Sequence, residues 1–371
     1  MADLAHDIPL PAQRPPAVST GVLGWLRANL FNSAFNTILT LIAVYFLVVT
    51  IPPAVRWTLI DAIWNAPNGQ ACRAAAGQEG GACWAFVAEK LRFILFGRFP
   101  YAEHWRPLFV VVIFIGVILA SCDRRLWGAR LVLLWLAALA VNGVLMWGGV
   151  LGMTYVDTSL WSGLPLTLIL AVVGMVFAFP FAILLALGRR SQLPAVRMIS
   201  VAYIELVRGV PLITVLFMAS VMLPLFLPTG LTIDKLLRAQ VAFILFAAAY
   251  LAEVVRGGLQ AIPKGQIEAA DSLGLGYWRT TRLIVLPQAL AVVIPPLVNN
   301  FIGAFKNTSL VIIIGLFDLL GTANAALTDA AWQGFATEAY VVTAAVYFCF
   351  CFFMSRYSEM LERAFSSGRR H

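Results

Sequence analysis

Long apolar runs divide this sequence, and they limit its possible folds more than any other feature. A helix of about 20 apolar residues crosses the ~30 Å hydrocarbon core of a bilayer. Eight such runs are present, at residues 34–52, 107–121, 131–149, 163–187, 207–227, 240–262, 288–316 and 339–354. With 61% hydrophobic and 12% charged residues, the composition excludes a water-soluble protein. We predict an all-α, polytopic membrane protein with about eight transmembrane helices.

The basic residues predict how the chain crosses the membrane. A net charge of +8 can indicate nucleic-acid binding, but the Lys and Arg residues here cluster at the ends of apolar runs, which is a topology signal. Short loops that are rich in Lys and Arg lie on the cytoplasmic side. This rule predicts an inner-membrane protein with cytoplasmic tails at residues 1–30 and 364–371, and no nucleic-acid partner.

Residues 53–106 depart from that rule, because this loop is predicted outside although it carries six basic residues. Long loops cross membranes largely regardless of charge, so the topology stands. Cys72 and Cys83 would then face an oxidising periplasm, where a disulfide is expected. Residues 84–99 mix aromatic and charged side chains, which fits either an interfacial amphipathic helix or an ordinary loop. The three histidines are too scattered to form a metal site.

A fixed motif follows the sixth apolar run. It consists of Glu268, Ala269 and Ala270, then Gly274 after three residues, then Ile284, Leu286 and Pro287 after nine more. Glu and Ala favour a helix, small alanines allow it to enter a groove, and a glycine permits a left-handed turn at its end. We predict a protruding short helix, a turn at Gly274, and a second helix that stops near Pro287.

This motif resembles the cytoplasmic EAA loop of binding-protein-dependent ABC importer permeases, at every defined position. The resemblance covers residues 163–363 and points to the polar amino-acid uptake branch. Further matching residues are Gly163-Leu164, Thr167-Leu168, Tyr203-Ile204-Glu205, Arg208-Gly209-Val210-Pro211-Leu212, Glu253, Arg256-Gly257-Gly258, Lys264-Gly265-Gln266 and Lys306 to Leu310. Val210 replaces the threonine that is usual in this family. Three additional spans in residues 31–162, and the loop Gly81-Ala82-Cys83-Trp84, resemble the larger permease of general L-amino-acid or Glu/Gln/Asp/Asn importers.

The resemblance implies a permease subunit whose last five helices, residues 163–363, form the ABC permease core. The loop 263–287 would couple this core to a separate ATPase. Implied partners are a second homologous permease, two copies of a cytoplasmic ABC ATPase, a periplasmic amino-acid-binding protein and an L-amino acid that is moved by alternating access. No phosphate-binding G-x-x-x-x-G-K-[ST] loop occurs, so ATP and Mg are expected on the partner ATPase. We expect no cofactor, metal or catalytic residue in this chain.

The pattern Glu-x-x-Arg-Gly occurs twice, at Glu205 with Arg208 and at Glu253 with Arg256. A spacing of three places opposite charges on one face of a helix, where they can pair. Charges at membrane depth are costly unless they are paired, so these residues are candidates for gating. The alternative is an ion pair that only anchors helix ends at the cytoplasmic interface.

Polar residues also gather in the seventh apolar run, which Pro295 and Pro296 interrupt. They are Asn299, Asn300, Lys306, Asn307, Thr308 and Ser309. Polar groups at this depth are tolerated where they line a cavity, and Lys306 could meet the carboxylate of an amino acid. Hydrogen bonding between helices is the alternative.

Two other functional classes compete with the ABC permease. An ion-coupled secondary amino-acid carrier would explain the membrane fold but not the EAA loop, and no internal repeat supports it. An intramembrane enzyme is disfavoured because no apolar run contains a histidine or a paired aspartate.

Overall fold

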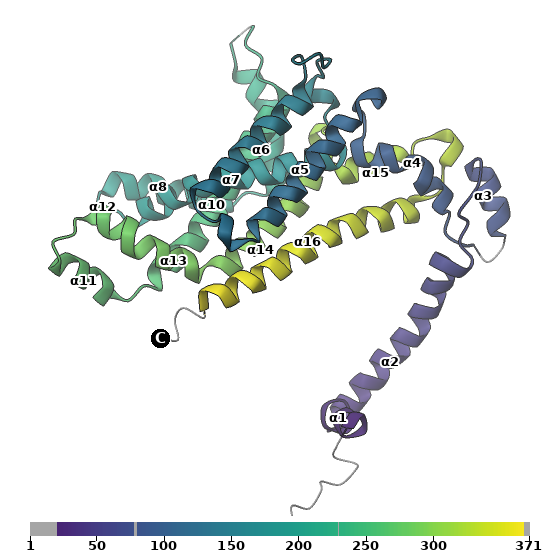
Figure 1. The fold of residues 1–371 in the computed structure, drawn as a ribbon, viewed down its shortest axis with the longest axis horizontal. Helices are drawn as coiled ribbons and strands as arrows, with labels where there is room; N and C mark the ends of the chain where they lie inside the picture. The colour runs from purple at the N-terminus through teal and green to yellow at the C-terminus, as the bar shows by residue number, and fades with distance from the viewer. Residues whose placement is uncertain (1–20, 78–79, 229, 367–371) are drawn as a thin grey trace, which may run out of the picture. The chain divides into compact units, whose positions relative to one another are not determined.

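The computed structural model describes residues 21–77, 80–228 and 230–366, and all of its regular elements are helical (Figure 1). The two predicted tails therefore lie largely outside the described residues. Contacts between Cα atoms divide the chain into two compact units. Of the described residues, 21–66, 71–77 and 80–84 form the first unit, and 67–70, 85–228 and 230–366 form the second.

The first unit consists of helices α1 (Gly21–Asn29) and α2 (Ala34–Val55), a π-helical segment at Arg56–Ile60, and most of α3 (Gly69–Ala76). Ser33 caps α2 by accepting a hydrogen bond from the Asn36 N–H at 3.2 Å. No side chain of α2 is buried, and the helix is apolar on every face, as expected for a lipid-exposed span. The predicted end at Pro52 is too early, because the helix continues through both prolines and the π-helical segment to Ile60.

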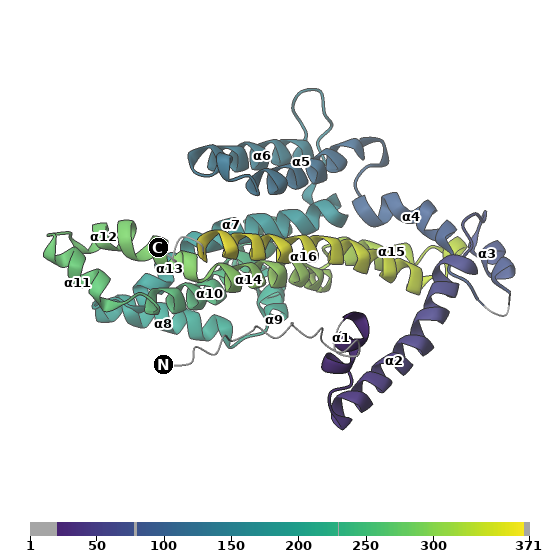
Figure 2. The same ribbon diagram turned by 60° about the horizontal axis from the view of Figure 1, so that its bottom comes forward.

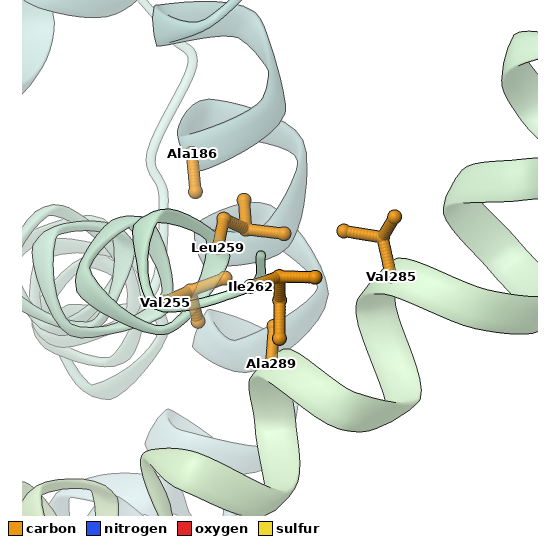
Figure 3. Close-up of a cluster of buried hydrophobic side chains, with 6 residues drawn as sticks. All are labelled: Ala186, Val255, Leu259, Ile262, Val285 and Ala289. Carbon is orange, nitrogen blue, oxygen red and sulfur yellow. The ribbon is translucent and has the colours of Figure 1, made fainter. Parts of the chain in front are cut away.

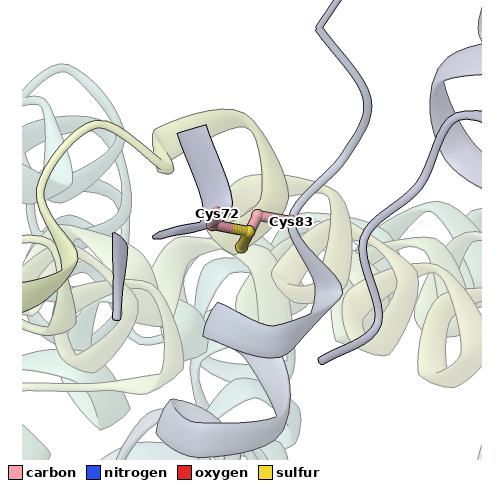
Figure 4. Close-up of a disulfide and its surroundings, with 2 residues drawn as sticks. All are labelled: Cys72 and Cys83. Atoms are coloured by element: carbon pink, nitrogen blue, oxygen red, sulfur yellow. A yellow bond between two sulfur atoms is a disulfide. The ribbon is translucent and has the colours of Figure 1, made fainter. Parts of the chain in front are cut away.

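A disulfide between Cys72 and Cys83 closes the loop of the first unit (Figure 4). The same two cysteines were paired in the sequence-based prediction. Around them, the Ile63 N–H donates to the Ala82 carbonyl at 2.8 Å, and the Trp84 indole N–H donates to the Thr58 carbonyl at 2.7 Å. The disulfide and these hydrogen bonds therefore cross-link the described residues 58–63 and 72–84 on either side of the gap at 78–79.

The second unit is a bundle of helices. Its α-helices are α4 (Trp84–Phe96), α5 (Trp105–Ser121), α6 (Ala129–Trp147), α7 (Gly163–Arg189), α8 (Pro194–Arg208), α9 (Leu212–Phe217), α10 (Lys235–Gln260), α11 (Lys264–Ser272), α12 (Tyr277–Thr280), α13 (Leu286–Val292), α14 (Ile294–Asn307), α15 (Leu319–Ala326) and α16 (Ala336–Ser366). Helix α7 packs along α10, helices α14 and α16 pack against each other, and α5 lies beside α6 (Figure 2).

Within the described residues, seven helical stretches are long and apolar enough to cross a membrane, and counting one bent pair as a span brings the number to eight, as predicted. The seven stretches are Ala34–Ile60, Tyr101–Ser121, Ala129–Trp147, Gly163–Arg189, Lys235–Gln260, Ile294–Ile314 and Ala336–Arg363. In the seventh predicted run, α13 ends at Val292 and α14 begins at Ile294, so the break falls directly before Pro295 and Pro296.

The fifth predicted run, residues 207–227, is not one straight span. The chain forms α8, turns at residues 209–211, and continues as α9 with a bend of 102°. Pro211 has no N–H for a helical ladder and directs the preceding residue away from helical geometry, so α8 ends before it. Beyond α9, the path continues as a π-helical turn at Met218–Met222 and a 3-10 turn at Leu223–Phe226.

Small residues bring the central helices close together. The face of α7 that is buried includes Ala178, Ala182 and Ala186, and Ala248 and Ala252 of α10 are also buried. Small side chains allow the backbones of membrane helices to approach and pack closely. Gly258 shows the same effect, because a Cβ atom there would lie 2.6 Å from the Ala289 carbonyl oxygen of α13.

Candidate functional site

The loop that carries the EAA motif forms the predicted helix and turn. Helix α11 ends in a left-handed turn at Gly274, whose φ is +73°. The Leu275 N–H donates to the Ala270 carbonyl at 3.1 Å, and the Gly274 N–H donates to the Asp271 carbonyl at 2.9 Å. These two bonds define a Schellman motif, which explains the requirement for glycine at position 274.

The motif residues of α11 divide between the two faces of this helix. Ala270 is 1% exposed and points inward, whereas Glu268 and Ala269 are exposed. Burial of the small side chain holds α11 close to its own chain, and the carboxylate is left available to a partner. The loop therefore presents one fixed face and one free face.

Four large side chains of this loop are exposed, and sequence reasoning missed them. Leu273, Tyr277, Trp278 and Leu283 are each at least 59% exposed. Single exposed apolar residues are ordinary, but a group of them on one short element marks an interaction surface. The signal available in the sequence was the aromatic pair that directly follows the Gly274 turn.

The second helix of the loop does not stop near Pro287, so this prediction is wrong. The chain passes from α12 through a π-helical turn at Thr281–Val285 into α13, with Pro287 in the first turn of that helix. Proline is tolerated there because the N–H groups of a first helical turn need no intrahelical acceptor. A π-turn often marks a functional segment within a helix.

A cluster of buried apolar side chains connects the loop with the two central helices (Figure 3). Its members are Ala186 of α7, Val255 and Leu259 of α10, Ile262, Val285 and Ala289. Two motif-region side chains, Ile267 and Leu286, pack against this cluster, and Ile284 is partly buried. Because protein interiors are close-packed, a displacement of the loop must move α7 and α10 or break this packing.

An ion-pair network lies near the cytoplasmic ends predicted for α7, α8 and α10. The Arg189 guanidinium of α7 lies 2.8 Å from the Glu205 carboxylate and 3.4 Å from the Glu253 carboxylate. Arg256 donates to Glu253 through its Nε at 2.9 Å and also through Nη2. Arg189 thus joins two acidic residues that belong to different helices. Its role was not recognised from the sequence, because no spacing pattern connects position 189 with either glutamate.

Among the described residues, Arg208 forms no ion pair in this network, although it lies within electrostatic range of Glu253. Its guanidinium lies over the Tyr250 ring, 5.6 Å from the ring centroid, and the Tyr250 hydroxyl donates to the Arg208 carbonyl at 3.4 Å. Glu205 therefore contacts Arg189 instead of the arginine three residues later. The two Glu-x-x-Arg-Gly copies converge in space but form different contacts.

The polar residues of the seventh span make mostly local contacts. The Asn300 amide donates to the Pro296 carbonyl, Thr308 is fully buried and donates to the Phe305 carbonyl, and the Ser309 hydroxyl donates to the Lys306 carbonyl, all at 2.8–2.9 Å. Asn299 and Lys306 are exposed, and Lys306 lies within electrostatic range of Cys351 on α16. These bonds hold the 3-10 turn Thr308–Ile314 that follows α14.

A buried acid supports this turn and was also missed from the sequence. Asp318 is fully buried, accepts from the Gly321 N–H at 2.9 Å, and accepts from the Tyr347 hydroxyl of α16 at 2.8 Å. Burial raises the pKa of the Asp318 carboxyl, while these hydrogen bonds oppose the rise. Next to it, the Leu319 N–H donates to the Thr167 hydroxyl of α7 at 3.0 Å. The network ties α7, α15 and α16 together.

Among the described residues, no group of three or more His, Cys, Asp or Glu side chains could hold a metal ion.

Comparison with known proteins identifies the loop and the helices around it. Residues 178–367 match the model of the family described as "Binding-protein-dependent transport system inner membrane component". The chain is 49% identical to the inner membrane amino-acid ABC transporter permease protein YhdY of Escherichia coli, over 95% of each chain. It is 40% identical to the glutamate/glutamine/aspartate/asparagine transport system permease protein BztC of Rhodobacter capsulatus, over 97% of each. Among solved structures, an amino acid ABC transporter matches 54% of this chain and 92% of its own, with 31% identity and a TM-score of 0.49.

Proposed function

Because this chain belongs to the family of binding-protein-dependent transport system inner membrane components, we propose that it is the membrane-spanning permease subunit of an ATP-driven importer of L-amino acids. The names of the two relatives, one an amino-acid permease and the other a permease for glutamate, glutamine, aspartate and asparagine, support this class of substrate. The chain supplies the translocation path by alternating access, and ATP hydrolysis takes place on a separate subunit.

One observation carries the proposed coupling to an ATPase: the exposed EAA loop is anchored on the apolar cluster that joins α7 with α10. The free face of α11, with Glu268 and the neighbouring Leu273 and Trp278, is available to a partner. The opposite side of the loop, through Ile267 of α11 and Leu286 of α13, packs against the buried cluster that joins α7 with α10. A partner that pushed on α11 would therefore shift α7 and α10, which is the movement that alternating access requires.

The complex that follows from this arrangement contains a second homologous permease, two copies of a cytoplasmic ABC ATPase that bind ATP and Mg, and a periplasmic amino-acid-binding protein. In this orientation the EAA loop and both termini lie in the cytoplasm, while the Cys72–Cys83 loop lies in the periplasm. Asn299, Asn300, Lys306, Thr308 and Ser309 remain candidates for the substrate path.

The test is to replace Gly274 and Glu268 separately. Gly274→Val places a β-branched residue at φ +73°, with a local strain of about 1–3 kcal/mol. Glu268→Lys reverses a charge on the free face, where a like-charge contact costs several kcal/mol. We expect both variants to insert normally and to lose ATPase association, measured by pull-down of a tagged ATPase from detergent and by uptake of labelled amino acids.

The matched control is Glu362→Lys, an equivalent charge reversal at an exposed position of α16. It should retain ATPase association and uptake. Full uptake by both loop variants would show that this loop does not couple the chain to an ATPase.

A further inference from the structure

Two irregular segments of the core contact α9 and lie near the first turn of α10. One is the π-helical turn Met218–Met222, which follows α9, and the other is the 3-10 turn Thr308–Ile314, which ends in a left-handed residue at Gly315. Helix α9 packs against this 3-10 turn, and α10 packs against both α9 and the π-turn. Irregular backbone at membrane depth is tolerated where protein buries it or where it lines a cavity, and transporters place solute sites at such breaks.

Two basic side chains of α10 point toward these breaks. The Lys235 ammonium lies against Gly315, 3.6 Å from the position that a Cβ atom would occupy there. Arg238, three residues later and therefore on the same face, donates through Nη1 to the Ser220 carbonyl of the π-turn. Each of the two broken spans is thus approached by one cation.

Neither cation is neutralised by the described part of the chain. Lys235 and Arg238 form no ion pair there, and the Arg238 Nε is buried without a hydrogen-bond partner. The adjacent Asp234 carboxylate is already engaged, because it accepts from the Leu237 N–H at 2.9 Å and from the Thr158 hydroxyl at 2.5 Å. A buried guanidinium nitrogen without a hydrogen-bond partner is costly, and basic residues in the first turn of a helix also oppose its dipole. Lys235 is exposed and can be solvated, so an anion is favoured chiefly by Arg238, whose Nε is buried without a hydrogen-bond partner, with the Lys235 ammonium as a second, accessible cation.

We propose that Lys235 and Arg238 bind the carboxylate of the transported amino acid at the end of α10 opposite to the EAA loop. This inference rests on the proposed function and names a solute site within it. A guanidinium and an ammonium together suit a carboxylate, since each supplies charge-assisted N–H donors. Ser220 is 8% exposed and Arg238 is partly buried between packed segments, which favours a small solute over the surface of a docking protein.

The site also has a geometric relation to the coupling loop. Helix α10 has 26 residues and so extends for roughly 40 Å, with this cation pair in its first turn and the EAA loop shortly after its last. Because the buried cluster under the loop includes Val255 and Leu259 of the same helix, a movement driven by the ATPase would be carried along α10 to the carboxylate site.

The test uses the complete transporter in proteoliposomes, with its partner permease, ATPase and binding protein. Uptake of a uniformly labelled mixture of L-amino acids is measured together with ATP hydrolysis. We expect Arg238→Met to lower the uptake per ATP hydrolysed about tenfold, Arg238→Lys and Lys235→Met to lower it about threefold, and the exposed control Arg197→Met to leave it unchanged. Lys235→Met carries the test if Arg238→Met does not assemble, since the Lys235 ammonium makes no hydrogen bond to the described fold.

Three outcomes would overturn the inference. An unchanged ratio of uptake to ATP hydrolysis in the Arg238 and Lys235 variants would show that these cations do not hold the solute. A parallel fall of uptake and of binding-protein-stimulated hydrolysis would assign them to docking of the binding protein. Absence of uptake by the unaltered transporter would remove the proposed function itself, whereas the first two outcomes leave that function in place.

Discussion

The segments at residues 205–209 and 253–257 share the pattern Glu-x-x-Arg-Gly but form different contacts. In α10, Glu253 binds Arg256 of its own copy and also Arg189. In α8, Glu205 binds Arg189, while Arg208 lies over the Tyr250 ring. The α10 copy is followed by another turn of helix, whereas α8 ends at Arg208, directly before the bend. A spacing of three thus permits pairing, but neighbouring helices decide whether it occurs.

Arg189 of α7 contacts the glutamate of each copy. Its replacement should therefore have the largest effect on the free energy of unfolding. Arg189→Met leaves two carboxylates facing each other without the cation that joins them. Breaking a buried ion pair costs about 3–5 kcal/mol, and partial exposure of these side chains reduces our expectation to about 2 kcal/mol. The measurement is SDS-induced unfolding of the purified protein in detergent. Neutralising both acids in the same variant should recover most of the loss, and no recovery would contradict the bridging role.

The second prediction concerns the α10 copy alone. Glu253→Gln removes the acceptor shared by Arg256 and Arg189, and we expect a loss of about 1–1.5 kcal/mol in the free energy of unfolding. The same unfolding assay applies, with Glu359→Gln as the control, because the Arg356–Glu359 pair is exposed and should contribute little. Equal effects of the two replacements would show that the Glu253 contacts are ordinary surface pairs.

The third prediction concerns the α8 copy alone. The Glu205 side chain is 55% exposed, so its attraction to Arg189 is weakened by solvent. Glu205→Gln should lower the free energy of unfolding by about 0.5 kcal/mol or less, and should do so less at high salt. If Glu205→Gln proved as harmful as Glu253→Gln, the contrast between the two copies would not hold.

The smallest expected value is the interaction energy between Glu205 and Arg208. A double-mutant cycle with Glu205→Gln and Arg208→Met should give a coupling near zero, because the two side chains form no ion pair in the described structure. The corresponding cycle with Glu253→Gln and Arg256→Met should give about 1 kcal/mol. Any loss from Arg208→Met alone would then report its contact with Tyr250, for which about 0.5 kcal/mol is typical. A coupling of similar size in both cycles would contradict the observed geometry.

Much of the fold was available from the sequence, because span length and apolar character are local properties. Seven spans were located within several residues, and the left-handed turn at Gly274 was predicted from residue type and spacing. The bend at Pro211 was missed, since its hydrophobic run continues without interruption through residues 210–227. The continuation of the helix through Pro287 was also missed, because a preceding π-turn accommodates this proline.

For the candidate sites too, some residues could be predicted from local sequence and others only from the tertiary structure. The residues of the EAA loop could be named as candidates in advance because they form a motif of fixed spacing within one short stretch of sequence. Arg189, Asp318, Lys235 and Arg238 could not, because their importance lies in partners that are distant along the chain or in the absence of a partner.

By itself, the sequence determined that this chain crosses a membrane about eight times, carries an EAA loop with a left-handed turn at Gly274, and lacks a phosphate-binding loop of its own. These properties follow from short-range patterns of hydrophobicity, residue type and spacing. Only the tertiary structure decided which two acids Arg189 binds, where the fifth span bends, and which cations of α10 form no ion pair among the described residues. The physical reason is that charge pairing and burial depend on contacts between helices. The spacing of residues within one helix does not determine which side chains of the neighbouring helices contact it.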